Sequence, residues 1–332
     1  MKTKEKDIEY CGVDRGKISK SHPELNEEVF GFLYKYIIDR YKVHIRKDVK
    51  KDLPPWTHNS VIADHRFTNV RRELDKQTKW MLEHITNNPD LTLRAKIENT
   101  ILFRLFSSYE TMELLGLPNK NIQDWESFVE SCREKVESKK AEEPKFKFFT
   151  SAFMTSGMKG TWMKRTGERD SVMAILKSAV YIHENRIAAK VQHAKNQQYC
   201  YDIIRSLPGF GDFMAYQIFV DLTYIQRFPF SENEFTIAGI GAKKGLNYLF
   251  RDYDGLNYEE AIFWLRDNIN QQAKELLGVD LEFELVKLMK DIPRHDRYMN
   301  VMSLENCMCE LGKYCDIIYK KGRNRPKYRG GK

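Results

Sequence analysis

The sequence of 332 residues predicts an all-α fold. Apolar residues recur at helical spacing along most of the chain, as Val29, Leu33, Ile37 and Tyr41 do at every fourth position. Residues 235–240 form the only short β-like run, and no repeat of fixed period occurs. Because 42% of the residues are apolar and 12% aromatic, the chain can bury a sizeable core, which excludes a disordered protein.

The predicted helices follow one another with short breaks. A helix over residues 25–47 is followed by a loop at Pro54 and Pro55, because proline cannot continue a helix. Gly116 and Pro118 mark the end of a later one. Residues 148–165, rich in Gly, Ser and Thr, are expected to form a loop. The remaining predicted helices cover residues 64–84, 92–115, 124–140, most of 170–207, 258–277, 281–291 and 303–320.

Charge and composition predict how the chain is divided. A charged, proline-containing stretch around residues 138–147 is the best internal boundary. We expect an N-terminal helical region over residues 1–145 and a second region over 146–319, packed together as one unit. The tail, residues 320–332, holds seven basic and no acidic residues, and the rest of a chain of net charge +8 is nearly neutral. Such a tail suits a polyanion such as DNA, or it is a solubilising end; its predicted DNA contacts are Lys320, Lys321, Arg323 and Arg325.

The cysteines and the hydropathy exclude several classes of protein. Six cysteines in so long a chain predict free thiols and a reducing compartment. Cys307, Cys309 and Cys315 lack a fourth ligand, so no metal is expected, and no cofactor is predicted either. The sequence has no run of about 18 uncharged apolar residues and no secretory signal at its start. We therefore expect no membrane contact and a cytoplasmic location.

The sharpest local signal is Leu207-Pro-Gly-Phe-Gly211, followed by Ala215 and Ile218, which is the spacing of a helix-hairpin-helix. Gly209 and Gly211 permit a tight turn with exposed N–H groups, and the next helix begins there with the positive end of its dipole. Gly209, Phe210 and Gly211 are therefore predicted to bind a DNA backbone phosphate without choosing bases. The alternative is an ordinary connection between two helices.

Helical DNA glycosylases carry such a hairpin and an Asp some 20 to 25 residues beyond it. Here the nearest acids are Glu232 and Glu234, outside that context, so the scaffold is supported but glycosidic cleavage is not. The same window contains Ala238-Gly-Ile-Gly-Ala-Lys-Lys-Gly245, whose N–H groups are predicted to surround an anion. This segment lacks the length and ending of a P-loop, so an NTPase is not expected. A glycine-rich turn that begins a helix is the alternative.

A third signal is the basic stretch over residues 66–75. On the helix expected there, Arg66, Asn69 and Arg72 share one face, and Arg71 lies four residues before Asp75 and can pair with it. The alternative is a solvated charged face.

Taken in order, five segments resemble one known family. They are Phe67-Thr-Asn-x-x-Arg-x-x-Asp75, Phe149-Thr150, the hairpin segment 207–218, Glu234-Phe-x-x-Ala-Gly-x-Gly-Ala-x-x-Gly245, and Glu305-Asn-x-x-Cys-Glu-x-x-Lys-Tyr314. This set is similar to the α-glutamyl/putrescinyl-thymine pyrophosphorylase family of phage-type DNA hypermodification, over residues 60–328. The chain departs from that pattern at Ile240, where the family has Pro, and in the two arginines that follow Val70.

The resemblance implies a helix-hairpin-helix, DNA-glycosylase-like fold that does not excise the base. It implies a transferase that acts on 5-hydroxymethyluracil in duplex DNA after a partner kinase has pyrophosphorylated the base. An amine from an amino acid or polyamine then replaces pyrophosphate on the 5-methylene carbon. If the chain is encoded by a phage, the expected location is the cytoplasm of the host.

The residues of the five segments suit this chemistry. The base must be flipped out of the duplex, and cations must face the leaving oxygens. The predicted catalytic residues are Glu234 and Asp221, for deprotonation of the incoming ammonium, and Arg66 and Arg71, for the leaving group. The predicted substrate-binding residues are Thr68, Asn69, Gln217, Tyr216, Phe149, Gly239, Gly241, Lys243 and Lys244, with Trp80 as a further stacking candidate. Two alternatives stay open: a DNA glycosylase or lyase with Lys243 or Lys244 as nucleophile, and a non-catalytic DNA-binding protein.

Overall fold

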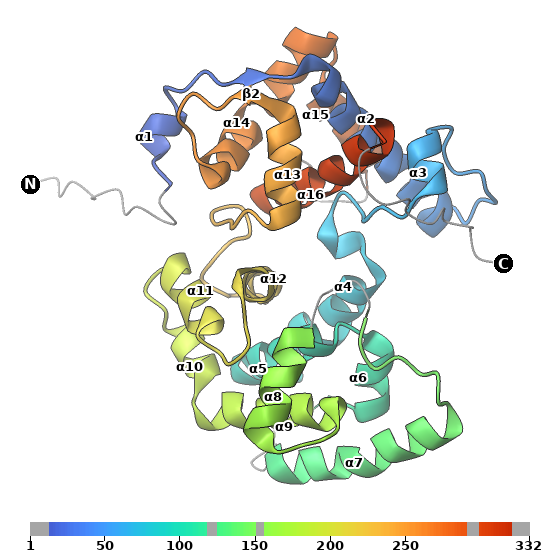
Figure 1. Cartoon of the computed structure of the whole chain (residues 1–332), viewed down its shortest axis with the longest axis vertical. Coiled ribbons are helices and arrows are strands. Elements are labelled where there is room, and N and C mark those ends of the chain that lie inside the picture. The colour runs from blue at the N-terminus through green and yellow to red at the C-terminus, as the bar shows by residue number, and fades with distance from the viewer. Residues whose placement is uncertain (1–12, 118–124, 151–155, 291–298, 321–332) are drawn as a thin grey trace, which may run out of the picture. The chain divides into compact units, whose positions relative to one another are not determined.

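The computed structural model describes residues 13–117, 125–150, 156–290 and 299–320. Helices α1 to α16 dominate these residues, and the only sheet among them is one short antiparallel pair of strands (Figure 1). The all-α prediction is therefore confirmed. None of the helices in this part of the chain combines the length and the hydropathy that a bilayer span requires.

The chain forms two compact units, which do not follow the boundary expected near residue 145. The first unit contains residues 1–72 and 232–332, and the second contains residues 73–231. The first unit is thus built from both ends of the chain, and the second from its middle.

The first unit packs long amphipathic helices around α16. Its helices are α1 (Arg15–Ile18), α2 (Glu27–His44), α3 (Ser60–Asp64), α13 (Ile240–Leu249), α14 (Tyr258–Leu277), α15 (Leu281–Leu288) and α16 (Val301–Ile318). Strands β1 (Glu24–Leu25) and β2 (Phe250–Asp252) pair antiparallel. Helix α14 has the bounds expected from the sequence, because Asn257 and Glu260 form a capping box at its start and Gly278 ends it at φ +67°.

The second unit holds the remaining helices. These are α4 (Lys76–Met81), α5 (Leu93–Phe106), α6 (Tyr109–Leu115), α7 (Trp125–Glu142), α8 (Ser156–Thr166), α9 (Ser171–Glu184), α10 (Ile187–Gln192), α11 (Gln197–Arg205) and α12 (Asp212–Thr223). The expected helix over residues 92–115 is split, because Ser107 adopts a left-handed conformation that ends α5 and Ser108 caps α6. The expected loop over residues 148–165 is helical from Ser156 onward.

Two further expectations about local structure were wrong. Residues 235–240 form no strand but lead into α13, and residues 64–84 do not form one helix. Between α3 and the 3₁₀ turn Arg72–Leu74, the chain is irregular. Tertiary hydrogen bonds replace the missing helical ones there, as described next.

Candidate functional site

Residues 66–72 are held by side chains from distant helices. The Tyr36 hydroxyl donates to the Thr68 carbonyl at 3.1 Å, and Arg40 Nε donates to the Phe67 carbonyl at 3.1 Å. From α16, Asn306 Nδ2 donates to the Asn69 carbonyl at 3.0 Å and to Thr68 Oγ1 at 3.2 Å. Three consecutive carbonyls are thereby satisfied without a helix, which stabilises an irregular backbone in a buried position.

This conformation changes where the predicted residues of the segment lie. Asn69, Arg71 and Arg72 are buried, whereas Arg66 and Thr68 are exposed. The expected helical face shared by Arg66, Asn69 and Arg72 does not exist. Instead, the charge of Arg72 acts on the carboxylate of Glu305 on α16.

Hydrogen bonds join the loop before α13 to the N-terminal ends of α14 and α16. Asn300 Nδ2 donates to Glu232 Oε1 at 2.6 Å, and the Val301 amide donates to Asn233 Oδ1 at 3.1 Å. Further along the loop, the Ala238 amide donates to Glu259 Oε1 at 2.9 Å.

One more hydrogen bond joins this loop to Glu305 on α16. The Gly239 amide donates to Glu305 Oε1 at 3.2 Å. Residues 238 and 239 therefore direct their N–H groups to carboxylates of the protein itself. The glycine-rich segment predicted to surround an anion is mostly helix, since α13 begins at Ile240.

The glycines of α13 serve close packing against α16. A Cβ added to Gly245 would overlap the Met308 carbonyl oxygen, and one added to Gly241 would overlap Cys309 Sγ. On the facing helix, a Cβ at Gly312 would lie 3.1 Å from the Gly245 nitrogen. Glycine at these positions lets the two backbones approach, and this approach carries Gly239 to Glu305.

Among these residues, Glu305 has a strongly shifted pKa. Its pKa is raised to about 7. Burial is the main cause and the nearby charge of Glu259 adds to it, whereas the Gly239 N–H and the charge of Arg72 lower the pKa. A carboxyl group with a pKa near neutrality can accept and release a proton at physiological pH. Glu305, Arg72, Gly239 and Glu259 are called the Glu305 site below.

The lysines of α13 already have partners. Lys244 Nζ lies 2.6 Å from Asp316 Oδ2, and Lys243 Nζ lies 5.5 Å from the centre of the Tyr258 ring. Glu234 is exposed, and its charge acts on Arg15. The first unit thus contains Arg66, Thr68, Asn69, Arg71, Glu234, Gly239, Gly241, Lys243 and Lys244 from the predicted set.

Asp221 lies in the second unit and forms an ion pair with Arg104. Arg104 Nε lies 2.5 Å from Asp221 Oδ2 and Arg104 Nη2 lies 2.9 Å from Oδ1, and both side chains are buried. Both carboxylate oxygens therefore bind one guanidinium, an arrangement that joins α5 to α12.

The aromatic and amide residues of this unit that were predicted to bind the base are either buried or stacked on other aromatic rings of the protein. Tyr216 and Gln217 are buried within α12. The Phe149 ring stacks on Phe106 at 5.2 Å between centroids, with Lys159 Nζ 4.4 Å from the Phe149 centre. Trp80 is stacked between His84 and Phe103.

The segment predicted to form a helix-hairpin-helix contains α11, a turn and α12 (Figure 1). Gly209 has φ +80°, and a Cβ there would lie 3.1 Å from the Met158 Cα of α8, so one side of the turn is packed. A Cβ at Gly211 would meet nothing within 4 Å. Phe210 is buried, whereas Phe213 on the next turn is about half exposed at 48%. Of the predicted tail contacts, Lys320 is exposed; Lys321, Arg323 and Arg325 lie outside the described residues.

Sequence reasoning placed Glu305 and Asn306 in a family segment and Arg72 in the basic stretch, but it gave none of them a role in the site. One signal was present: Val301, Leu304, Met308 and Leu311 mark the buried face of the last helix, and Glu305 lies on that face. A carboxyl group at such a position needs a partner or a function. Within the described residues, no cluster of three or more His, Cys, Asp or Glu could hold a metal.

Comparisons with known proteins give the following matches. A family model described as "5-hmdU DNA kinase, helical domain" matches residues 27–323. A protein of Bacillus phage SP10 described as a 5-hmdU DNA kinase is 24% identical over 306 residues, which cover 88% of this chain and 46% of that protein. The chain therefore spans about half the length of this relative. No solved structure matches the chain.

Proposed function

The chain belongs to the family of the helical domain of 5-hmdU DNA kinases, and from this premise we propose that it acts in the hypermodification of thymine in phage DNA. The substrate of the proposed reaction is 5-hydroxymethyluracil in duplex DNA that a coupled kinase has pyrophosphorylated. The proposed product carries an amino acid or polyamine amine on the 5-methylene carbon, and pyrophosphate is released.

The observation that carries the proposal is Glu305, a buried carboxyl group with a pKa of about 7 beside Arg72. An amine is protonated near neutral pH and cannot attack until it loses a proton. In the proposed step the ammonium gives a proton to Glu305 and its nitrogen forms a bond to the methylene carbon. The carbon–oxygen bond to pyrophosphate breaks, and its electron pair leaves on that oxygen.

Cations of the same unit support the departure of pyrophosphate. Arg72 acts on the Glu305 carboxylate, and Arg66 and Lys243 are exposed. Lys244 is also exposed but is paired with Asp316, so it would have to exchange that partner for the leaving group. Positive charge near the leaving oxygens stabilises the charge that develops on them. Asn69 and Thr68 stay the proposed contacts of the uracil edge. DNA backbone contacts are proposed for the α11–α12 hairpin and the basic tail, which contribute affinity without choosing a sequence.

We propose different roles for the two buried carboxylates. Asp221 has both oxygens on Arg104, so we propose a structural role for it and give the role of general base to Glu305. Cys307 is no competing nucleophile, because burial raises the pKa of its thiol well above the ordinary value.

One experiment tests the proposal directly. A duplex carrying 5-pyrophosphoryloxymethyluracil is incubated with the protein and a pool of amino acids and polyamines, then digested to nucleosides for mass measurement. We expect a nucleoside with an amine at the 5-methylene carbon, together with free pyrophosphate. Free base with an abasic site would instead establish a glycosylase.

A second candidate function follows from the relative, which is described as a kinase and is about twice as long as the match. In that case the chain presents the 5-hydroxymethyl base to a kinase active site elsewhere. Tight binding of a 5-hydroxymethyluracil duplex, with the pyrophosphorylated duplex left unchanged, would favour this function over the transferase.

A further inference from the structure

The connection between α2 and α3 in the first unit carries apolar side chains that stand in solvent. A π-helical turn, Ile45–Val49, follows α2, and the chain from there to α3 is irregular (Figure 1). Leu53 is 85% exposed and Val49 is 53% exposed. Pro54 and Pro55 follow Leu53 and are exposed as well. Apolar side chains gathered in solvent are typical of a surface that binds another molecule.

Hydrogen bonds hold this segment in one shape. The Asp52 amide donates to the Arg46 carbonyl at 2.8 Å, and Trp56 Nε1 donates to the Asp52 carbonyl at 2.7 Å. Arg46 Nη1 donates to the Trp56 carbonyl at 3.2 Å, so Arg46, Asp52 and Trp56 meet at the base of a loop. Leu53 is therefore presented on a fixed backbone, and little conformational entropy is lost when it binds. Residues 45–56 are called the basic loop below.

Three lysines of the basic loop have charges that no acid of the protein balances. Lys47, Lys50 and Lys51 are exposed, and none of them forms an ion pair with another described residue. Lys47 Nζ instead lies 4.9 Å from the centre of the Trp56 ring. Lys50 and Lys51 stand between the two exposed aliphatic residues in the sequence.

The two acidic residues of the basic loop already have partners. Asp48 Oδ2 lies 2.8 Å from His44 Nδ1, and Asp52 Oδ2 lies 3.4 Å from Arg46 Nε. The loop holds four basic residues against these two acids. Its surface therefore combines uncompensated positive charge with apolar side chains, which suits a polyanion that also offers an apolar surface.

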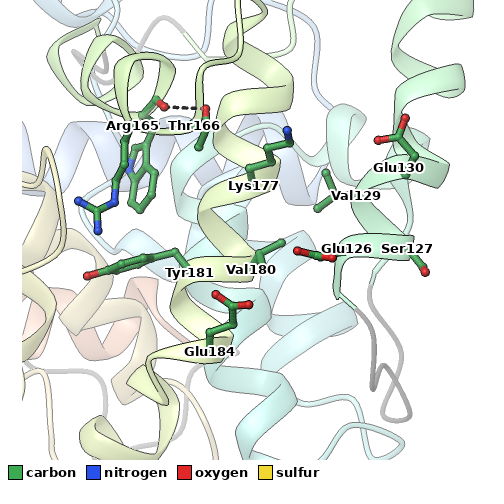
Figure 2. Close-up of a pocket in the computed structure, with 11 residues that line it drawn as sticks. Glu126, Ser127, Val129, Glu130, Arg165, Thr166, Lys177, Val180, Tyr181 and Glu184 are labelled. Atoms are coloured by element: carbon green, nitrogen blue, oxygen red, sulfur yellow. Dashed lines mark hydrogen bonds between the residues drawn. The ribbon is translucent and has the colours of Figure 1, made fainter.

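A pocket in the second unit has a different charge. It measures about 650 Å³ and is lined by residues of α7, α8 and α9 (Figure 2). Its charged lining residues are three glutamates, one arginine and one lysine, namely Glu126, Glu130, Glu184, Arg165 and Lys177. A polyanion is therefore matched better by the basic loop than by this pocket.

We propose that the basic loop bends duplex DNA by inserting Leu53 into the minor groove. This groove is about 6 Å wide, and the two phosphate backbones border it. An aliphatic side chain that enters between two base pairs unstacks them and kinks the duplex. Lys50 and Lys51 bind phosphates beside the inserted side chain. The activity requires no modified base.

The balance of charge and apolar surface favours DNA over a lipid bilayer. An interfacial membrane anchor needs a broad apolar face in addition to its basic residues. The large apolar side chains that the basic loop exposes are Val49 and Leu53 alone. Two such side chains suffice for a wedge between bases, so anionic lipid is the competing outcome of the test.

The inference goes beyond the proposed reaction and does not depend on it, because the test uses unmodified DNA and measures its shape. A duplex of about 30 bp carries a fluorescent donor at one end and an acceptor at the other. Binding of the full chain should raise the energy transfer by an amount that corresponds to a bend of about 20–90°. Affinity is measured with the same duplex at about 50–200 mM salt.

Variants separate the wedge from the charges. Leu53→Gln should abolish the bend and weaken binding about tenfold, while the slope of log affinity against log salt stays unchanged. Leu53→Met retains an apolar wedge and should retain the bend. The double variant Lys50→Gln, Lys51→Gln should reduce the salt slope by about 1–2. All three residues are exposed, so these changes should not impair folding.

Two substitutions of the same unit are the matched controls. Phe283→Gln changes a side chain on α15 that is 56% exposed, and Lys20→Gln changes an exposed lysine outside the basic loop. Both should leave the bend and the salt slope unchanged.

Three results would overturn the proposal. They are unbent DNA in the saturated complex, a bend that Leu53→Gln retains, and binding to phosphatidylserine vesicles that Leu53→Gln abolishes while DNA affinity stays the same. Amine transfer is measured separately as nucleoside mass, so failure of the reaction and failure of the wedge are distinguishable.

Discussion

Glu305 in the first unit and Asp221 in the second are both buried carboxylates, and they differ in how completely their oxygens are bound. Asp221 places one oxygen on each of two nitrogens of Arg104. Glu305 accepts one amide N–H at 3.2 Å and senses Arg72 only through its charge. A bidentate ion pair fixes a carboxylate as an ion, whereas a desolvated group with one weak partner can exchange a proton. Burial alone therefore does not mark a reactive acid.

The largest expected effect comes from removing the proton acceptor of the Glu305 site. Glu305→Gln retains the shape of the side chain and should lower the rate of amine transfer by about 10²–10⁴-fold, the usual contribution of a general base. The rate is measured as the 5-amino nucleoside formed in a single turnover. Glu310→Gln, a buried carboxylate further along α16 that lies 3.4 Å from Lys313, is the control and should retain most activity. Equal losses in both variants would mean that Glu305 is structural.

The second-largest expected effect comes from removing the charge of Asp221. Asp221→Asn breaks the buried ion pair between Asp221 and Arg104, which should lower the free energy of unfolding by about 3–5 kcal/mol. Urea unfolding followed by circular dichroism measures this loss. The double variant Arg104→Met, Asp221→Leu removes both charges and should recover much of the stability. A stable Asp221→Asn protein that has lost transfer activity would return the catalytic role to Asp221.

The pH dependence of stability also distinguishes Glu305 from Asp221. The folded pKa of Glu305, about 7, lies above the value of about 4.3 expected for an unfolded chain, so the folded protein binds this proton more tightly. The contribution of protonated Glu305 to the free energy of unfolding is fully present below about pH 4 and is lost as the pH rises through 7, by roughly 4 kcal/mol in all.

Glu305→Gln should remove this part of the slope when unfolding is compared between about pH 5 and 8. The transfer rate should show the opposite trend and rise with pH through about 7, because the base must be deprotonated to act. A rate that is flat with pH in this range, in the absence of another slow step, would contradict the assignment of Glu305 as the base.

The sequence predicted those parts of the molecule that depend on nearby residues. Helix α14 begins and ends as expected because its capping box and its final glycine lie within the segment itself. Helices α11 and α12 lie on either side of Gly209 and Gly211, where the sequence placed a turn. The all-α class required only the spacing of apolar residues along each helix.

What sequence reasoning missed depends on contacts between distant segments. The irregular chain at Phe67 to Asn69 exists because Tyr36, Arg40 and Asn306 bind its carbonyls, and none of these residues lies nearby in sequence. The pKa of Glu305 likewise depends on burial and on Gly239, 66 residues away. Asp221 looked available because its partner Arg104 lies on another helix.

The smallest expected effect concerns the glycines that bring Gly239 to Glu305. Gly245→Ala places a methyl group in overlap with the Met308 carbonyl oxygen, which should force α13 away from α16 and lower the free energy of unfolding by at least about 1–3 kcal/mol. The same shift should lengthen the Gly239–Glu305 bond, raise the pKa of Glu305 and move the pH–rate profile to higher pH. Gly160→Ala on α8 is the matched control, because a Cβ there meets nothing within 4 Å. Since alanine favours a helix over glycine, this control should gain about 0.5–1 kcal/mol and leave the profile in place. If Gly245→Ala lowers the free energy of unfolding and Gly160→Ala raises it, the α13 glycine is required for close packing. If both substitutions raise it, the α13–α16 contact is not what sets the pKa of Glu305.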